Sequence, residues 1–179
     1  MPIRRSLRPV AVRRIETAAY ALLDAAPLCA LSTISPRGMA YVSTAYFGWN
    51  RRFELVWLSS PSARHSRNIA ARPTTAVAVY DARQQWGESD RGIQLFGSSR
   101  RLSETNAREA EESYAQRFPS WEPAGGGDYA FYRFDAARLK VFDEALLGDG
   151  TFLTARIDRD GRLTWDMTEI YTAHGEGVR

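Results

Sequence analysis

One short segment of the chain brings together residue types that bind anions. It runs from Leu58 to Ile69 and reads Leu-Ser-Ser-Pro-Ser-Ala-Arg-His-Ser-Arg-Asn-Ile. The pattern predicts a strand that ends in serine hydroxyls and a helix whose first turn holds Arg64 and His65, with Arg67 one turn further along. The first N–H groups of a helix have no partner within it, and the helix dipole is positive at that end. Hydroxyls, free amides and a guanidinium in this order suit a phosphate group.

The same segment has a second interpretation, which the residue types alone leave open. A serine-capped helix with an exposed basic face has the same composition and needs no ligand. In the anion-site interpretation, each charge-assisted contact contributes about 1.5 to 3 kcal/mol, so several contacts hold a phosphate monoester firmly.

The counts of reactive residues exclude several other chemistries. Cys29 is the only cysteine and lies in an apolar run, which predicts a buried thiol and excludes a disulfide within the chain. The two histidines, His65 and His174, match no metal-ligand spacing, so no metal site is expected. The Gly-x-x-x-x-Gly-Lys phosphate loop is absent, and the three glycines at 125–127 do not open a helix after a strand. The chain has few reactive groups of its own but has a turn that can bind an anion. This combination suggests that a bound cofactor supplies the chemistry.

Length and charge indicate one domain over residues 1–179, with residues 1–9 as a loose arm. The net charge is +3, and Lys140 is the only lysine. The arginines near the N-terminus favour a solvated helix face over a nucleic-acid arm, and we expect no nucleic-acid partner. No apolar run is long enough for a membrane span and no secretory pattern follows the first arginines, so a soluble cytoplasmic protein is expected.

The periodicity predicts a mainly β chain with flanking helices. An apolar stripe at spacings of three and four predicts a helix from Pro9 to Ala26. Helices are also expected from about Ser62 to Ala71 and from Ser103 to Phe118. The segments with strand character are Leu28–Ile34, Met39–Trp49, Phe53–Leu58, Thr74–Tyr80, Gly92–Leu102, Tyr129–Phe134, Leu139–Phe142, Phe152–Ile157 and Leu163–Trp165. Short strands with closely spaced turns indicate an antiparallel barrel or sandwich.

The order of the motifs resembles one known family. The Cys29–Thr33 run, the Tyr41–Tyr46 strand, the Ser59-Ser60-Pro61 turn, the Arg64–Ile69 helix and the Gly92–Gly97 strand follow one another as in the pyridoxamine 5′-phosphate oxidase-like flavin-binding split-barrel superfamily. The match covers about residues 26–102. It implies an antiparallel split β-barrel of six to eight strands with an N-terminal helix.

The resemblance also implies where a flavin, expected to be FMN, would bind. In such proteins the strand matching Ser43–Tyr46 lies along the flavin ring, the turn and helix start hold the phosphate, and a strand glutamine approaches the ring or ribityl chain. Gly92 is an alternative match for that last position. The cofactor-binding residues assigned in this way are Ser43, Thr44, Ala45, Tyr46, Ser59, Ser60, Arg64, His65 and Gln94.

The function that the resemblance implies is an FMN-dependent oxidoreductase that transfers hydride through the flavin N5 to or from a small molecule. The flavin of such proteins lies at a two-fold interface, so a homodimer is expected, and Trp121 is a candidate for reaching the partner's flavin. The authentic oxidase has an arginine where Ser43 stands, and residues 166–171 do not match its substrate-binding end. Oxidation of vitamin B6 is therefore not expected, and no catalytic residue is assigned.

Three alternatives remain open at this point. The same fold can serve as a flavin or haem carrier or sensor without turnover, which the scarcity of acids and bases favours. A deazaflavin can replace FMN as the cofactor. A nucleic-acid-binding module that uses the arginine-rich N-terminus belongs to a different class.

Overall fold

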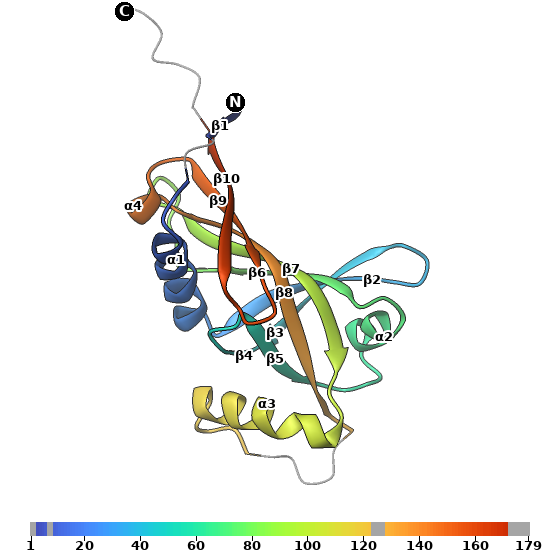
Figure 1. Cartoon of the computed structure of the whole chain (residues 1–179). Helices are drawn as coiled ribbons and strands as arrows, with labels where there is room; N and C mark the ends of the chain where they lie inside the picture. The colour runs from blue at the N-terminus through green and yellow to red at the C-terminus, as the bar shows by residue number, and fades with distance from the viewer. Residues whose placement is uncertain (1–2, 7–8, 123–127, 172–179) are drawn as a thin grey trace, which may run out of the picture.

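The computed structural model describes residues 3–6, 9–122 and 128–171 (Figure 1). Within these residues there are ten strands and four helices. The strands are β1 (Ile3–Ser6), β2 (Leu28–Ile34), β3 (Ala40–Tyr46), β4 (Gly48–Trp49), β5 (Glu54–Ser59), β6 (Thr74–Tyr80), β7 (Arg91–Arg101), β8 (Ala130–Asp143), β9 (Thr151–Ile157) and β10 (Leu163–Tyr171). The helices are α1 (Val12–Ala25), α2 (Arg64–Ala71), α3 (Glu104–Arg117) and α4 (Glu144–Leu147).

The strands form one open antiparallel sheet. Its order is β1-β10-β9-β8-β7-β6-β2-β3, and β5 pairs with β8 and with β4 away from this path. The long β8 pairs with β7 along most of its length, from Tyr132 to Asp143, while its other edge pairs first with β5 and then with β9. The sheet therefore splits at β8 and curls without closing, which confirms the predicted mainly β split barrel with flanking helices.

Along the strands, side chains alternate between the buried face of the sheet and its outer face. On β2, Cys29, Leu31 and Thr33 are buried, whereas the residues between them are half-buried or exposed. The inner face packs against α1, whose apolar stripe includes Ile15 and Leu22, and the predicted helix is thereby confirmed. A smaller apolar cluster joins α3 to the other face of β5 and β8; its buried members are Val56, Leu102, Ala110, Tyr114 and Phe131. Figure 1 shows α1, α2 and α3 at separate places around the sheet.

Some elements differ from the sequence-based expectation. Residues 3–6 are no loose arm, because Ile3–Ser6 pairs with β10 in an antiparallel register that matches Ile3 with Tyr171. β10 extends to Tyr171, well past the predicted end at Trp165, since each of its edges has a partner strand. Two predicted strands merge into β8, and the short β1 and β4 raise the total to ten, above the expected six to eight.

A glycine allows β7 and β8 to pair across a bulge. The register shifts between Phe96 and Gly97, where a Cβ atom added to Gly97 would overlap the carbonyl oxygen of Asp135. Gly97→Ala should therefore destabilise the protein by about 2 to 4 kcal/mol, since two backbones must separate. Urea unfolding measures the change, and Ser98→Ala on the same strand should cost less than about 1 kcal/mol. Equal midpoints for Gly97→Ala and the unaltered protein would contradict the prediction.

Candidate functional site

The corner between β5 and α2 is a tightly folded turn. β5 ends at Ser59, and the N–H of Ala63 donates to the carbonyl of Ser60 at 3.0 Å. The hydroxyl of Ser60 accepts from the N–H of Ser62 at 3.2 Å and lies 2.8 Å from the Ser62 hydroxyl. The serine hydroxyls of the turn therefore bond to one another and to the turn's own backbone.

The N-terminus of α2 is left uncapped by this arrangement. Its N-cap position is Ala63, and among the described residues no side chain accepts from the first N–H groups of the helix. The serine cap of the second interpretation is therefore wrong for this helix, whereas its exposed basic face is present in Arg64 and Arg67. The N–H groups of the first turn and the positive end of the helix dipole remain available to an anion.

His65 joins the first turn of the helix to the end of β5. Its Nε2 lies 2.7 Å from the hydroxyl oxygen of Ser59, in a hydrogen bond whose direction depends on the histidine tautomer. Ser59 is buried and His65 is half-buried. Burial lowers the pKa of His65 from its ordinary value, because desolvation disfavours the imidazolium. The histidine is therefore mainly neutral at neutral pH in the free protein.

Arg64 connects the corner to β3. Its guanidinium carbon lies 5.0 Å from the centroid of the Tyr41 ring, and Nη1 donates to the Tyr41 hydroxyl at 3.3 Å. Arg64 is exposed and makes no ion pair with any described residue. Tyr41 thus holds the guanidinium in place while its charge stays uncompensated, which is the state that an anion site needs.

A buried hydrogen bond that the sequence did not reveal fixes α2 to the sheet. Nδ2 of Asn68 donates to Oγ1 of Thr33 at 3.0 Å, and both residues are buried. Asn68 lies one turn after Arg64, so this bond sets the rotation of the helix and turns Arg64 towards β3. Nothing in the spacing of Thr33 and Asn68 signals the pair, because 35 residues separate them.

β3 lies at one edge of the sheet and carries four of the predicted cofactor-binding residues. Among the described strands it pairs with β2 alone. Ser43 and Ala45 are half-buried and point to the same side as Tyr41, whereas Thr44 and Tyr46 are exposed on the other side. The second edge of β3 therefore offers backbone donors and acceptors that have no partner strand.

The structure separates Gln94 from the corner. Gln94 is exposed on the outer face of β7, in a row that passes through Ala78 and Ala30 to Thr44. Three strand spacings of roughly 4.8 Å place Gln94 about 14 Å from Thr44. Gly92, the alternative match, is buried against the ring of Phe142. Within one protomer, Gln94 and the β5–α2 corner therefore do not meet.

The outer face of the sheet is apolar over the strands nearest to β3. We call this the outer patch: Leu28, Val42, Tyr46, Tyr80 and Phe96, all of them exposed. Val42, inside β3, is 70% exposed, and Tyr46, the last residue of β3, is 56% exposed. The strand registers place all five side chains on the same side of the sheet. Several exposed apolar side chains on one face of a sheet are typical of a protein interface.

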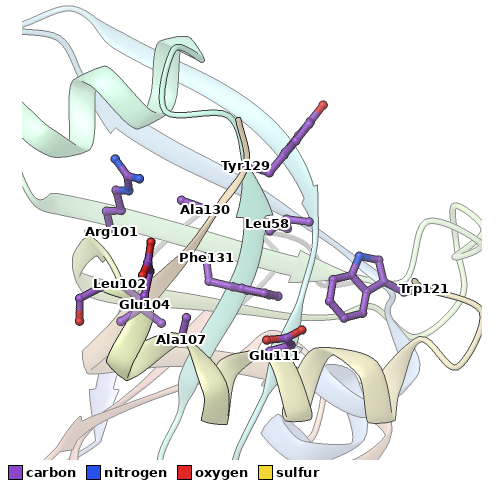
Figure 2. A pocket seen from close by; sticks show the side chains of 11 residues that line it. Leu58, Arg101, Leu102, Glu104, Ala107, Glu111, Trp121, Tyr129, Ala130 and Phe131 are labelled. Atoms are coloured by element: carbon purple, nitrogen blue, oxygen red, sulfur yellow. The ribbon is translucent and has the colours of Figure 1, made fainter. Parts of the chain in front are cut away.

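A large cavity lies between α3 and strands β5 and β8, next to the corner (Figure 2). Its volume is about 580 Å³, and we call it the α3 pocket. Leu58, Phe131 and Trp121 form an apolar wall, and Figure 2 shows Arg101 at the opposite end of the pocket from Trp121. Ala130 pairs with Ser59, so the pocket and the corner share a strand pair.

Trp121 packs within its own chain. Its ring makes edge contacts with Tyr114 at 5.5 Å and with Phe131 at 5.9 Å between centroids. The side chain thereby becomes part of the α3 pocket, and the interpretation that it reaches towards a partner finds no support in this position.

The remaining reactive groups offer no second centre. Cys29 is buried as predicted, and burial raises its pKa to about 12, so the thiol is no nucleophile at neutral pH. His174 lies outside the described residues. In the part of the chain that the structure covers, no group of three or more histidine, cysteine or carboxylate side chains could hold a metal ion. No helix there is long and apolar enough to cross a membrane.

A family model decides the relationship of the chain. The model for pyridoxamine 5′-phosphate oxidase matches residues 15–143, which include β3, the corner, α3 and the sheet as far as the end of β8. The chain belongs to the pyridoxamine 5′-phosphate oxidase-like family. The predicted resemblance is thereby confirmed, and over more of the chain than the sequence motifs covered.

Solved structures show the same fold at low identity. A haem-binding protein from Mycobacterium smegmatis matches with a TM-score of 0.67 and 17% identity, over 87% of this chain and 62% of that one. ChuZ of Campylobacter jejuni matches with a TM-score of 0.68 and 12% identity, over 87% of this chain and 63% of that one. An F420 reductase matches with a TM-score of 0.53 and 20% identity, over 66% of this chain and 93% of that one. This family member thus spans less than two thirds of the first two proteins, and no curated protein matches it.

Proposed function

We propose that this protein binds FMN by its phosphate at the β5–α2 corner and acts as a flavin-dependent oxidoreductase. The observation that carries the proposal is the uncapped start of α2 with the unpaired Arg64 guanidinium held over Tyr41. Ser59, Ser60 and His65 lie in the same turn and at the start of the same helix, and they supply further polar groups. This donor set fits a phosphate monoester, because it supplies positive charge, free amides and hydroxyls.

The flavin ring would lie along β3, beside the α3 pocket. The free backbone edge of Ser43–Tyr46 supplies donors and acceptors for the polar edge of the ring. The bound flavin would supply the chemistry, with N5 as the atom that accepts or gives hydride. The chain's own part would be to hold the phosphate, orient the ring and exclude water with Leu58, Phe131 and Trp121, in a pocket of a size suited to a small substrate.

A homodimer would complete this site. The outer patch gives each protomer an exposed apolar surface, which a second copy related by a two-fold axis would cover. Gln94 lies on this outer face, so it would approach the flavin of the partner rather than that of its own protomer. The free thiol of Cys29 fits a reducing compartment such as the cytoplasm.

Native mass spectrometry and absorbance of the protein purified without added cofactor test the proposal together. The expected result is a dimer that carries FMN and shows flavin absorbance, followed by steady oxidation of NADH or NADPH with a suitable acceptor. A Soret band would indicate that the bound cofactor is haem and not FMN. Tight binding of a deazaflavin, together with no binding of FMN, would indicate a deazaflavin cofactor. Both groups are named for proteins of the same fold. A flavin that stays bound without turnover would indicate a carrier. A colourless protein that FMN does not titrate would reject the proposal.

His65 should make FMN binding dependent on pH. Its pKa is lowered in the free protein, and a phosphate dianion beside it would favour the imidazolium, so its pKa should be higher in the complex. Binding then takes up a proton, and FMN affinity should rise several-fold as the pH falls from about 8 to about 6.5. Quenching of FMN fluorescence measures this, and His65→Gln should flatten the profile. If FMN affinity still depends on pH in the His65→Gln variant, a group other than His65 causes the pH dependence.

A further inference from the structure

A cavity that we call the basic cavity lies on the side of α2 that faces away from β3. Arg64 and Asn68 contact β3 and β2, whereas Ser66 and Ala70, about half a turn away on the helix, line this cavity. Its volume is about 380 Å³. Pro73 and the end of β7 form the opposite wall, and Pro61 of the turn that precedes α2 also lines the cavity.

The charge in this cavity is of one sign. Arg67, Arg100 and Arg101 line it, and no aspartate or glutamate is among its described lining residues. Arg100 is paired with Asp135, but Arg67 and Arg101 make no ion pair within the described part of the chain. Arg101 also lines the α3 pocket, whose lining includes Glu104 and Glu111. The basic cavity is therefore the place where two uncompensated guanidinium groups converge.

A residue in the wall of this cavity has a buried hydroxyl without a partner. Ser66 is 2% exposed, and its Oγ has no hydrogen-bond partner among the described residues. Leaving a buried hydroxyl unpaired is unfavourable, so such a group in a cavity wall is expected where a polar ligand or water can bind. The neighbouring Ser99 is no such group, because its hydroxyl lies 2.7 Å from that of Thr75.

We propose that this cavity binds the phosphate group of a small organic phosphate monoester, at a site separate from the flavin phosphate. Arg67 and Arg101 would supply the charge and Ser66 a neutral hydrogen bond. Pro61, Ile69 and Ala70 give the cavity an apolar wall for the body of the ligand. The volume lies near the lower end of the range for small-molecule sites, which limits the ligand to a compact molecule.

The basic cavity adjoins both the α3 pocket and the β5–α2 corner. Arg101 lines the basic cavity and the α3 pocket, and α2 carries the basic cavity on one side and Arg64 on the other. A ligand that draws Arg101 into the basic cavity would take it away from Glu104 and Glu111. The occupant is therefore placed to change the charge of the α3 pocket without entering it.

Isothermal titration with phenyl phosphate and with inorganic phosphate tests the proposal in the Arg64→Gln variant, in which the corner has lost its guanidinium. The expected result is one equivalent bound per chain, with phenyl phosphate the tighter ligand because it also contacts the apolar wall. Adding Arg101→Gln or Arg67→Gln should weaken binding about tenfold or more, and Ser66→Ala about threefold or more. Arg108→Gln, which removes one exposed arginine charge from α3, should leave the affinity unchanged.

Three results would overturn the proposal. Equal affinity in the Arg101→Gln and Arg108→Gln variants would show that the cavity does not hold the anion. Loss of all binding on Arg64→Gln alone would place the phosphate at the corner instead. Equal affinity for the two probes would reject an organic monoester as the ligand. None of these outcomes depends on whether FMN is the cofactor, because the titration is made without it.

Discussion

Replacing Arg64 with glutamine should raise the Kd for FMN by roughly 10- to 100-fold. The guanidinium contacts β3 and makes no ion pair within the described part of the chain, and its loss removes one or two charge-assisted hydrogen bonds worth about 1.5 to 3 kcal/mol each. The fold should be unaffected, because Arg64 is exposed and its single hydrogen bond goes to the hydroxyl of Tyr41. Equilibrium titration followed by flavin fluorescence measures the change directly.

Two matched variants separate this effect from a general loss of charge. Arg64→Lys keeps the charge but lacks the planar fork, so it should recover only part of the affinity. Arg67→Gln removes the same charge from the same helix, one turn further on, where the side chain lines the basic cavity. It should change the affinity for FMN by less than about threefold. Equal losses for Arg64→Gln and Arg67→Gln would mean that the phosphate is held by the whole helix face and not by the corner.

The parts of this site that the sequence predicted are local ones. A strand that ends in serines and a helix that starts with Arg64 and His65 follow from residue types within about ten positions, and the structure has both. The Ser59–His65 contact spans six residues and belongs to the same local unit. Cys29 was predicted as a buried thiol from its apolar neighbours, and that is where it lies.

The parts that the sequence did not predict depend on contacts between distant segments. The placement of Arg64 over Tyr41 and the bond from Asn68 to Thr33 require the register of β2 and β3 relative to α2, which no local pattern encodes. The position of Gln94 depends on three successive strand pairings, and a one-residue slip in any of them would move it to the other face. β1 pairs with β10, which brings the two ends of the described chain together. The four residues of β1 carry no local pattern that predicts such a distant partner.

Placing a charge in the outer patch should dissociate the proposed dimer and release the flavin together. Val42 is the most exposed member of the patch, and Val42→Asp places a carboxylate on each side of a two-fold contact. An unpaired charge buried in an interface costs several kcal/mol, and a two-fold dimer would bury one such charge from each protomer. The mutant should therefore be monomeric at micromolar concentration. Light scattering after gel filtration measures the mass, and the Kd for FMN should rise about tenfold or more because each site loses the partner's surface.

The control for this variant is an exposed apolar residue elsewhere. Leu146 on α4 is 44% exposed and lies outside the outer patch, so Leu146→Asp should keep both the dimer and the flavin. Phe96→Asp changes a second member of the patch on a different strand and should reproduce the result of Val42→Asp. Since Val42 and Phe96 are both exposed, neither substitution should lower the unfolding midpoint of the monomer by much. A monomer that still binds FMN with full affinity would show that one protomer holds the whole flavin site, and Gln94 would then have no part in it.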